Sequence, residues 1–196
     1  MKRSGGRGKV GLPTSGAKRP MFVERVREIA AQQLAPPPRP PTAVAEGFLR
    51  LQRPLDLQIP PSHLPDGVVI TTLTADDAAP VHALLELAYA NGFGSVPGSM
   101  LDWWNGLLAD SEFDRNLAFV AKAGDEAVGF CLCWTSSFVK DLVVAPLWRN
   151  RGIGTALLAT ALAALKARGA QEVALKVDIY NGTAQRLYRQ FGFSQD

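Results

Sequence analysis

Apolar and polar residues follow two different periods along the last two thirds of the chain. Short apolar runs rich in β-branched residues are typical of buried strands, whereas apolar residues spaced three and four apart are typical of helices. Strands are predicted at 67–74, 117–122, 127–134, 138–144 and 172–178. Helices are predicted at 81–90, 99–108, 153–168 and 183–190. This order predicts a domain of the α/β class, in the broad sense that includes α+β folds.

The first third of the chain follows another pattern. Its first twenty residues are mainly glycine and basic residues, while apolar positions at helical spacing predict one helix at 22–34. A proline-rich run at 36–41 is typical of a stiff extended spacer, and the stretch that follows is irregular. We therefore divide the chain into a basic, proline-rich extension, 1–66, and a folded domain, 67–196.

Charge divides the chain at the same place. The first 66 residues carry 11 of the 21 Lys and Arg but only 5 of the 18 Asp and Glu, so the extension has a formal charge of +6 and the remainder −3. A basic tail can contact nucleic acid or acidic proteins. A solvated tail is the simpler interpretation, so nucleic acid is not an expected partner.

Size and composition are those of an ordinary soluble protein, with 196 residues, 47% of them hydrophobic and 20% charged. No apolar run reaches the roughly 18 residues that span a bilayer, so a membrane is not an expected partner. The basic start has no apolar segment behind it and does not resemble a secretory signal. We expect a cytoplasmic protein and leave homo-oligomerisation open.

The two cysteines, Cys131 and Cys133, lie in one predicted strand. Residues two apart in a strand face the same side about 7 Å apart, which is a poor geometry for a disulfide. Two thiols and two distant histidines, His63 and His82, do not make a zinc site, so no metal is expected. The scarcity of histidine also argues against a Ser-His-Asp hydrolase.

A basic, glycine-rich turn connects the predicted strand 138–144 to the helix 153–168. It reads R-N-R-G-I-G over residues 149–154. The first turn of a helix has backbone N–H groups without partners and is partly positive, and glycine lets an anion approach the backbone closely. The turn therefore predicts a phosphate site, although its R-x-x-G-x-G spacing is that of neither a Rossmann turn nor a P-loop.

Two further blocks accompany this turn. Val144-Ala145-Pro146 precedes it, and residues 181–193 read N-G-T-A-Q-R-L-Y-R-Q-F-G-F, which fits N-x-x-A-x-x-L-Y-x-x-x-G-F. In this order the blocks resemble those of the Gcn5-related N-acetyltransferases (GNAT superfamily), and the resemblance covers about residues 67–193. It implies a central mixed sheet, flanked by helices, whose central strands splay apart to hold coenzyme A.

One departure from the family is expected to matter. Its members usually continue from the final Gly-Phe into one or two more strands that close the substrate side, whereas here only residues 194–196 follow. The final strands are therefore expected to be missing. A shortened chain, a strand from another chain and a minimal variant all remain open, and each affects substrate binding more than the cofactor site.

The resemblance implies a binding site for acetyl-CoA, used as co-substrate. The backbone of the central strand would pair with the pantetheine arm, and the glycine-rich turn would hold the pyrophosphate. These implied cofactor-binding residues are Leu142, Val143, Val144, Arg149, Asn150, Arg151, Gly152, Ile153, Gly154, Thr155, Asn181 and Tyr188.

Two of these residues have a second interpretation each. Asn181 resembles the family's cofactor contact, and it is also well suited to cap the last helix. Tyr188 resembles the general acid that protonates the departing thiolate, for which a phenol has a fitting pKa. Simple packing on an amphipathic helix is the alternative for Tyr188, and we favour acid catalysis.

The general base is less clear. Lys176 stands where some relatives that acetylate protein N-termini have a glutamate, and a cation cannot serve as the base. Asp141, on the central strand, is slightly preferred to Asp178, and either is as readily a surface carboxylate. The amine could also arrive neutral. The predicted catalytic residues are thus Tyr188 and Asp141.

The resemblance also implies an acceptor site that involves the two-helix segment and the hairpin before the central strand. Its candidate residues are Phe93, Asp102, Trp103, Trp104 and Trp134. Aromatic rings in a slightly acidic domain suit a cationic amine. The sequence thus predicts an acetyl-CoA-dependent N-acetyltransferase that acts by direct transfer on a primary amine of a small molecule, peptide or protein. The alternatives are a non-catalytic acyl-CoA-binding module tethered by its basic extension and a nucleic-acid-associated protein.

Overall fold

The computed structural model describes residues 47–90, 93–96 and 98–195. The predicted helix at 22–34 and the proline-rich spacer lie outside these ranges. Among the described residues, no helix is long and apolar enough to cross a membrane.

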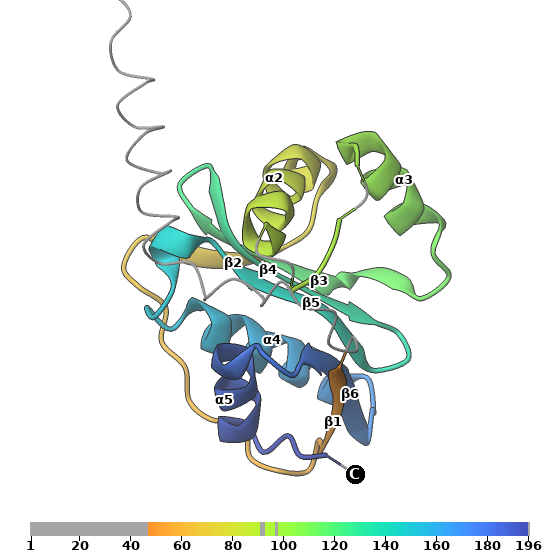
Figure 1. Cartoon of the computed structure of the whole chain (residues 1–196), viewed down its shortest axis with the longest axis vertical. Helices are drawn as coiled ribbons and strands as arrows, with labels where there is room; N and C mark the ends of the chain where they lie inside the picture. The colour runs from red at the N-terminus through yellow and green to blue at the C-terminus, as the bar shows by residue number, and fades with distance from the viewer. Residues whose placement is uncertain (1–46, 91–92, 97, 196) are drawn as a thin grey trace, which may run out of the picture.

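Helices cover both faces of a central sheet (Figure 1). The strands are β1 (Phe48–Pro54), β2 (Val68–Thr72), β3 (Phe113–Ala123), β4 (Glu126–Trp134), β5 (Phe138–Val144) and β6 (Glu172–Asp178). The helices are α2 (Ala78–Tyr89), α3 (Met100–Ala109), α4 (Ile153–Ala167) and α5 (Gly182–Gln190), with 3-10 turns at Ala75–Asp77 and Pro146–Trp148. Every strand and helix predicted after residue 66 is therefore confirmed, with bounds shifted by a few residues.

The sheet has the order β1-β6-β5-β4-β3-β2, and the described pairings are antiparallel except that of β5 with β6. Helices α2 and α3 lie on one face, and α4 and α5 lie on the other (Figure 1). Successive side chains of β4 point to opposite faces of the sheet and so pack against both helical layers. Phe130 and Leu132 pack towards α2 and α3, whereas Cys131 and Cys133 pack towards α4. Both cysteines are buried and free. The predicted mixed, helix-flanked sheet is confirmed.

The parallel pair β5–β6 separates soon after it begins. It pairs only Phe138 with Ala174 and Val139 with Leu175. On the other edge of β5, the register with β4 shifts between Leu132 and Cys133, so that Lys140 is an extra, bulged residue. The strands therefore diverge from the bulge onwards, which opens the splay that the resemblance implied.

Strand β1 corrects the predicted domain boundary, because it comes from the segment assigned to the extension. It pairs antiparallel with β6 along its whole length, from Phe48 opposite Asp178 to Pro54 opposite Glu172. The domain therefore includes residues 48–66. The pattern of this strand is hard to recognise because its inward positions are apolar at Leu51 but charged at Arg53.

Arg53 is fully buried and holds β1 against the rest of the domain. Its Nε donates to the carbonyl of Phe191, and one Nη donates to the carbonyls of Leu57 at 3.0 Å and Gln58 at 2.9 Å. No strand is assigned after α5 in the described residues, but Ser194 forms a bridge with Gln52 on the outer edge of β1. The edge of β6 is thus covered by a strand from the N-terminal side, an arrangement that the sequence did not suggest.

Candidate active site

The splay between β5 and β6 opens into a cleft of about 1020 Å³. Its walls come from β5, the glycine-rich turn, the start of α4, the end of β6 and α5, and Phe48 of β1 lies at its edge. All the predicted cofactor residues except Arg151 line this cleft. Segments far apart in the sequence therefore meet where the parallel pair comes apart.

The turn after β5 presents a helix N-terminus to the cleft. Asn150 and Gly152 adopt left-handed conformations, with φ of 59° and 85°. Gly152 is the N-cap of α4 and its backbone carbonyl accepts from Ala156, but no side chain caps the helix. The N–H groups of Ile153 and Gly154 have no acceptor within the helix, which is the arrangement that binds anions.

The two arginines of the turn lie differently. Arg149 is half-buried, and its Nε donates to the carbonyl of Val144 at 3.1 Å, which fastens the turn to the end of β5. Burial lowers the pKa of the Arg149 guanidinium. Arg151 is exposed, with its guanidinium carbon 5.1 Å from the centre of the Trp148 ring. Arg151 is thus the more accessible of the two cations.

The two glycines of the turn are required for different reasons. A Cβ on Gly152 would lie 2.7 Å from the backbone oxygen of His63, so the segment before β2 needs this glycine, apart from any anion. A Cβ on Gly154 would lie 3.5 Å from Val144 and 3.7 Å from Leu187, which is ordinary contact. Gly154 therefore leaves room in the cleft without being sterically required.

Strand β5 offers backbone groups to the cleft on the edge that β6 leaves. The N–H of Ala145 bonds to the carbonyl of Val128 on β4, and such bonds alternate along an antiparallel pair. The backbone of Val143 therefore points towards β4, while Leu142 and Val144 point towards the cleft. Of the three predicted strand residues, Leu142 and Val144 have the backbone orientation that the prediction requires.

The start of α5 closes the far side of the cleft. Asn181 caps this helix by accepting from the N–H of Ala184 at 3.1 Å, as the second interpretation of this residue required. Asp178 is buried, and its Oδ1 accepts from the N–H of Tyr180 at 2.8 Å. Lys176 is exposed at the cleft wall. The carboxylate of Asp178 thus takes part in the turn between β6 and α5.

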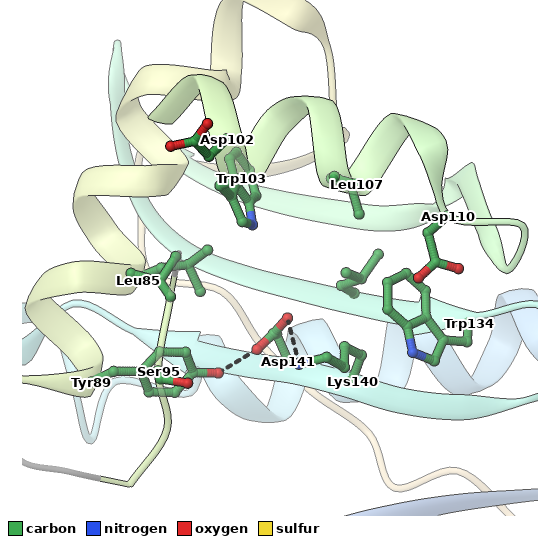
Figure 2. Close-up of a pocket in the computed structure, with 13 residues that line it drawn as sticks. Leu85, Tyr89, Ser95, Asp102, Trp103, Leu107, Asp110, Trp134, Lys140 and Asp141 are labelled. Atoms are coloured by element: carbon green, nitrogen blue, oxygen red, sulfur yellow. Dashed lines mark hydrogen bonds and ion pairs between the residues drawn. The ribbon is translucent and has the colours of Figure 1, made fainter. Parts of the chain in front are cut away.

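Asp141 has a partner that the sequence did not reveal. The hydroxyl of Tyr89, the last residue of α2, donates to Asp141 Oδ1 at 2.5 Å, and Lys140 Nζ lies 4.0 Å from Oδ2 (Figure 2). Burial, followed by the charge of Asp141, raises the pKa of Tyr89. The spacing of Val81, Leu85 and Tyr89 places all three on the inward face of α2, but it does not identify Asp141 as the partner.

Tyr188 lies in the wall of the cleft, buried on α5. Its ring meets that of Phe193 edge-on at 5.7 Å. Burial raises the pKa of the Tyr188 phenol, and the neighbouring Cys131 and Asp141 raise it further. The phenol therefore keeps its proton at neutral pH. No group of His, Cys, Asp or Glu among the described residues could hold a metal ion.

A model of the Acetyltransferase (GNAT) family matches residues 79–193, which contain the splay, the glycine-rich turn and Tyr188. The chain belongs to this family. The match starts within α2 and ends at Phe193, so β1, β2 and the segment between them lie outside the matched residues.

Curated GNAT relatives are similar over part of their length. The mycothiol acetyltransferase of Thermobispora bispora is 31% identical over 166 residues, which cover 77% of this chain and 55% of the relative. The N-alpha-acetyltransferase 30 of Xenopus laevis is 33% identical over 88 residues, which cover 41% of this chain and 32% of the relative. The matched part of this chain thus spans about a third of one of these two relatives and about half of the other.

A solved GNAT structure agrees with the fold. The crystal structure of a GCN5-related N-acetyltransferase from Sphaerobacter thermophilus has a TM-score of 0.64 and 28% identity, and covers 76% of this chain and 48% of that protein. The shared fold therefore extends beyond the residues that the family model matches.

Proposed function

We propose that this protein is an acetyl-CoA-dependent N-acetyltransferase that acts on a primary amine by direct transfer. The observation that carries the proposal is a single cleft with a helix N-terminus at one end and Asp141 and Tyr188 in its wall. The names of the relatives, a mycothiol acetyltransferase and an N-alpha-acetyltransferase, support transfer of an acetyl group.

The turn fits the pyrophosphate of coenzyme A. The free N–H groups of Ile153 and Gly154 and the positive end of the α4 dipole favour a phosphate at this point, and Arg149, which lines the same cleft, adds a positive charge. The backbone groups of Leu142 and Val144 would pair with the amides of the pantetheine arm. With the pyrophosphate at the turn and the pantetheine arm along β5, the thioester would lie near the bulge at Lys140.

Acetyl transfer requires that the amine lose a proton, that the thioester carbonyl be polarised and that the departing thiolate be protonated, and residues around the bulge can serve each of these steps. Asp141, held by Tyr89, accepts a proton from the incoming ammonium group, and the freed nitrogen lone pair attacks the carbonyl carbon. A backbone N–H of β5 donates to the carbonyl oxygen as negative charge develops there. The C–S bond then breaks, and Tyr188 donates its proton to the departing sulfur. The attacking nitrogen loses its second proton, which returns to Tyr188 through solvent, and Asp141 releases the first proton to solvent.

The proposal is tested by incubating the full chain with acetyl-CoA and a panel of amines. The panel contains free alkyl- and arylalkylamines and peptides with free N-termini, and blanks omit the amine. Thiol release that depends on the amine, with the acetylated product found by mass spectrometry, is the expected result. Tight coenzyme A binding without product from any amine would instead support a non-catalytic acyl-CoA-binding module, and absence of binding would reject both.

A further inference from the structure

A second cavity opens beside Asp141, on the face of the sheet opposite α4. It has a volume of about 190 Å³ and lies between α2, α3 and the ends of β4 and β5. Four residues line both this side pocket and the main cleft: Tyr89, Ser95, Lys140 and Asp141. The carboxylate of Asp141, with a side chain only 11% exposed, therefore stands where the two cavities meet.

The interior of the side pocket is apolar and aromatic. Leu107 and the rings of Trp103 and Trp134 face the space above Asp141 (Figure 2). Trp103 is buried, with its ring 5.9 Å from that of His82 and 6.4 Å from that of Phe130, so neighbours hold it in place. These side chains form a preformed wall for an apolar group.

The other carboxylates at the rim already serve the ends of α3. Asp102 accepts from the hydroxyl of Ser99 at 2.5 Å at the start of the helix. Asp110 accepts from the N–H of Glu112 at 2.8 Å just after the helix ends. The acidic residue at the junction with the cleft is thus Asp141, while Asp102 and Asp110 lie at the two ends of α3.

Gly106 points to a ligand independently of this lining. It lies inside α3, where glycine is less favourable than alanine. Gly106 lines the side pocket, and a Cβ added there meets no atom within 4 Å. Neither packing nor backbone conformation requires this glycine, and its effect is to keep the pocket wide at that point.

We propose that the side pocket receives a bulky apolar group, branched aliphatic or aromatic, carried close to the amino group of the acceptor. This inference rests on the proposed acetyl transfer. With the apolar group between Trp103 and Trp134, the amine would lie beside Asp141, at the opening to the cleft. A pocket of about 190 Å³ has room for one such side chain.

An arylalkylamine and the N-terminus of a peptide with a large apolar first residue share this chemistry. The experiment therefore uses two matched pairs of substrates, phenethylamine against ethylamine, and two peptides that differ only in an N-terminal Phe or Gly. For the wild-type chain we expect kcat/KM to be at least tenfold higher for the bulky member of a pair, about 1.4 kcal/mol in transition-state binding. The pair that shows the preference identifies the source of the acceptor.

The variant Gly106→Leu fills the pocket from its helical wall. It should lower kcat/KM for the bulky substrate at least tenfold and leave that for the small one nearly unchanged. Asn105→Leu is the matched control, since Asn105 is the exposed neighbour on the same helix and does not line the pocket. Gly106→Ala, which suits a helix better than glycine, should give a smaller loss of the same kind.

Equal kcat/KM for both members of each pair would overturn the inference but not the proposed function. An equal fall in kcat/KM for the bulky and the small substrate in Gly106→Leu would do the same. The ternary complex gives a second readout, because calorimetry with coenzyme A present should detect phenethylamine or the Phe peptide in the wild type and not in Gly106→Leu. If no amine of the panel is acetylated, the proposed function fails and this inference fails with it.

Discussion

The variant Gly154→Asp should weaken coenzyme A binding without disturbing the fold. The side chain fits, because a Cβ at Gly154 makes only ordinary contacts with Val144 and Leu187. An acidic residue in the first turn of α4 also complements the helix dipole by about 0.3–1 kcal/mol, so the melting temperature should stay the same or rise. Binding should suffer, because the new carboxylate would share the cleft with the pyrophosphate.

The size of this effect follows from Coulomb's law. Two like charges about 5 Å apart repel by roughly 3 kcal/mol at an effective dielectric constant of 20, before screening by salt. Even half of that energy weakens binding about tenfold. Gly154→Asn is the matched control, since it has nearly the same volume and no charge. The difference between the two variants is therefore the electrostatic part.

The assay is titration calorimetry of coenzyme A into each variant at low and high ionic strength. We expect the Asp variant to bind at least tenfold more weakly than the Asn variant at low salt, with a smaller ratio at high salt. Equal affinities of the two variants in folded protein would refute the placement of the pyrophosphate at this helix end. Gly152 is a poorer site for the test, since its left-handed φ of 85° and the nearby His63 carbonyl make any substitution disturb the turn.

Three further predictions concern other parts of the site and the fold. Tyr188→Phe keeps the ring but removes the acidic proton. Steady-state kinetics should therefore show kcat reduced by about 10²–10⁴-fold, with little change in KM for acetyl-CoA. Full activity would leave Tyr188 with a packing role only. Tyr89→Phe removes a hydrogen bond to the Asp141 carboxylate, worth about 1.5 kcal/mol. Steady-state kinetics should show kcat reduced roughly tenfold, while the affinity for coenzyme A stays the same. An unchanged kcat would contradict a positioning role for Tyr89. Arg53→Met removes the hydrogen bonds to three carbonyls, so the free energy of unfolding should fall by about 3 kcal/mol and the melting temperature by roughly 6–12 °C. Arg50 is exposed on the same strand, so the control Arg50→Met should leave the melting temperature nearly unchanged.

The sequence by itself determined the local elements and the helix start at which we propose the anion site. Strand β5, the glycine-rich turn and α4 follow one another directly, and each depends on residues only a few positions apart. The periods of apolar residues and the end of a helix are set by such short-range geometry. For this reason the pattern predicted the bounds of β5 and β6 without error and located the turn that begins α4.

Only the tertiary structure decided which distant residues meet. Tyr89 and Asp141 are 52 positions apart, and Arg53 reaches the carbonyl of Phe191 across 138 positions. The topology brings these pairs together by laying α2 against β5 and β1 beside β6, and no local period records such contacts. The tertiary structure also places the His63 carbonyl against Gly152, so that only glycine fits there. It likewise forms the side pocket beside Gly106, which is a space left between helices and strands once the chain has folded.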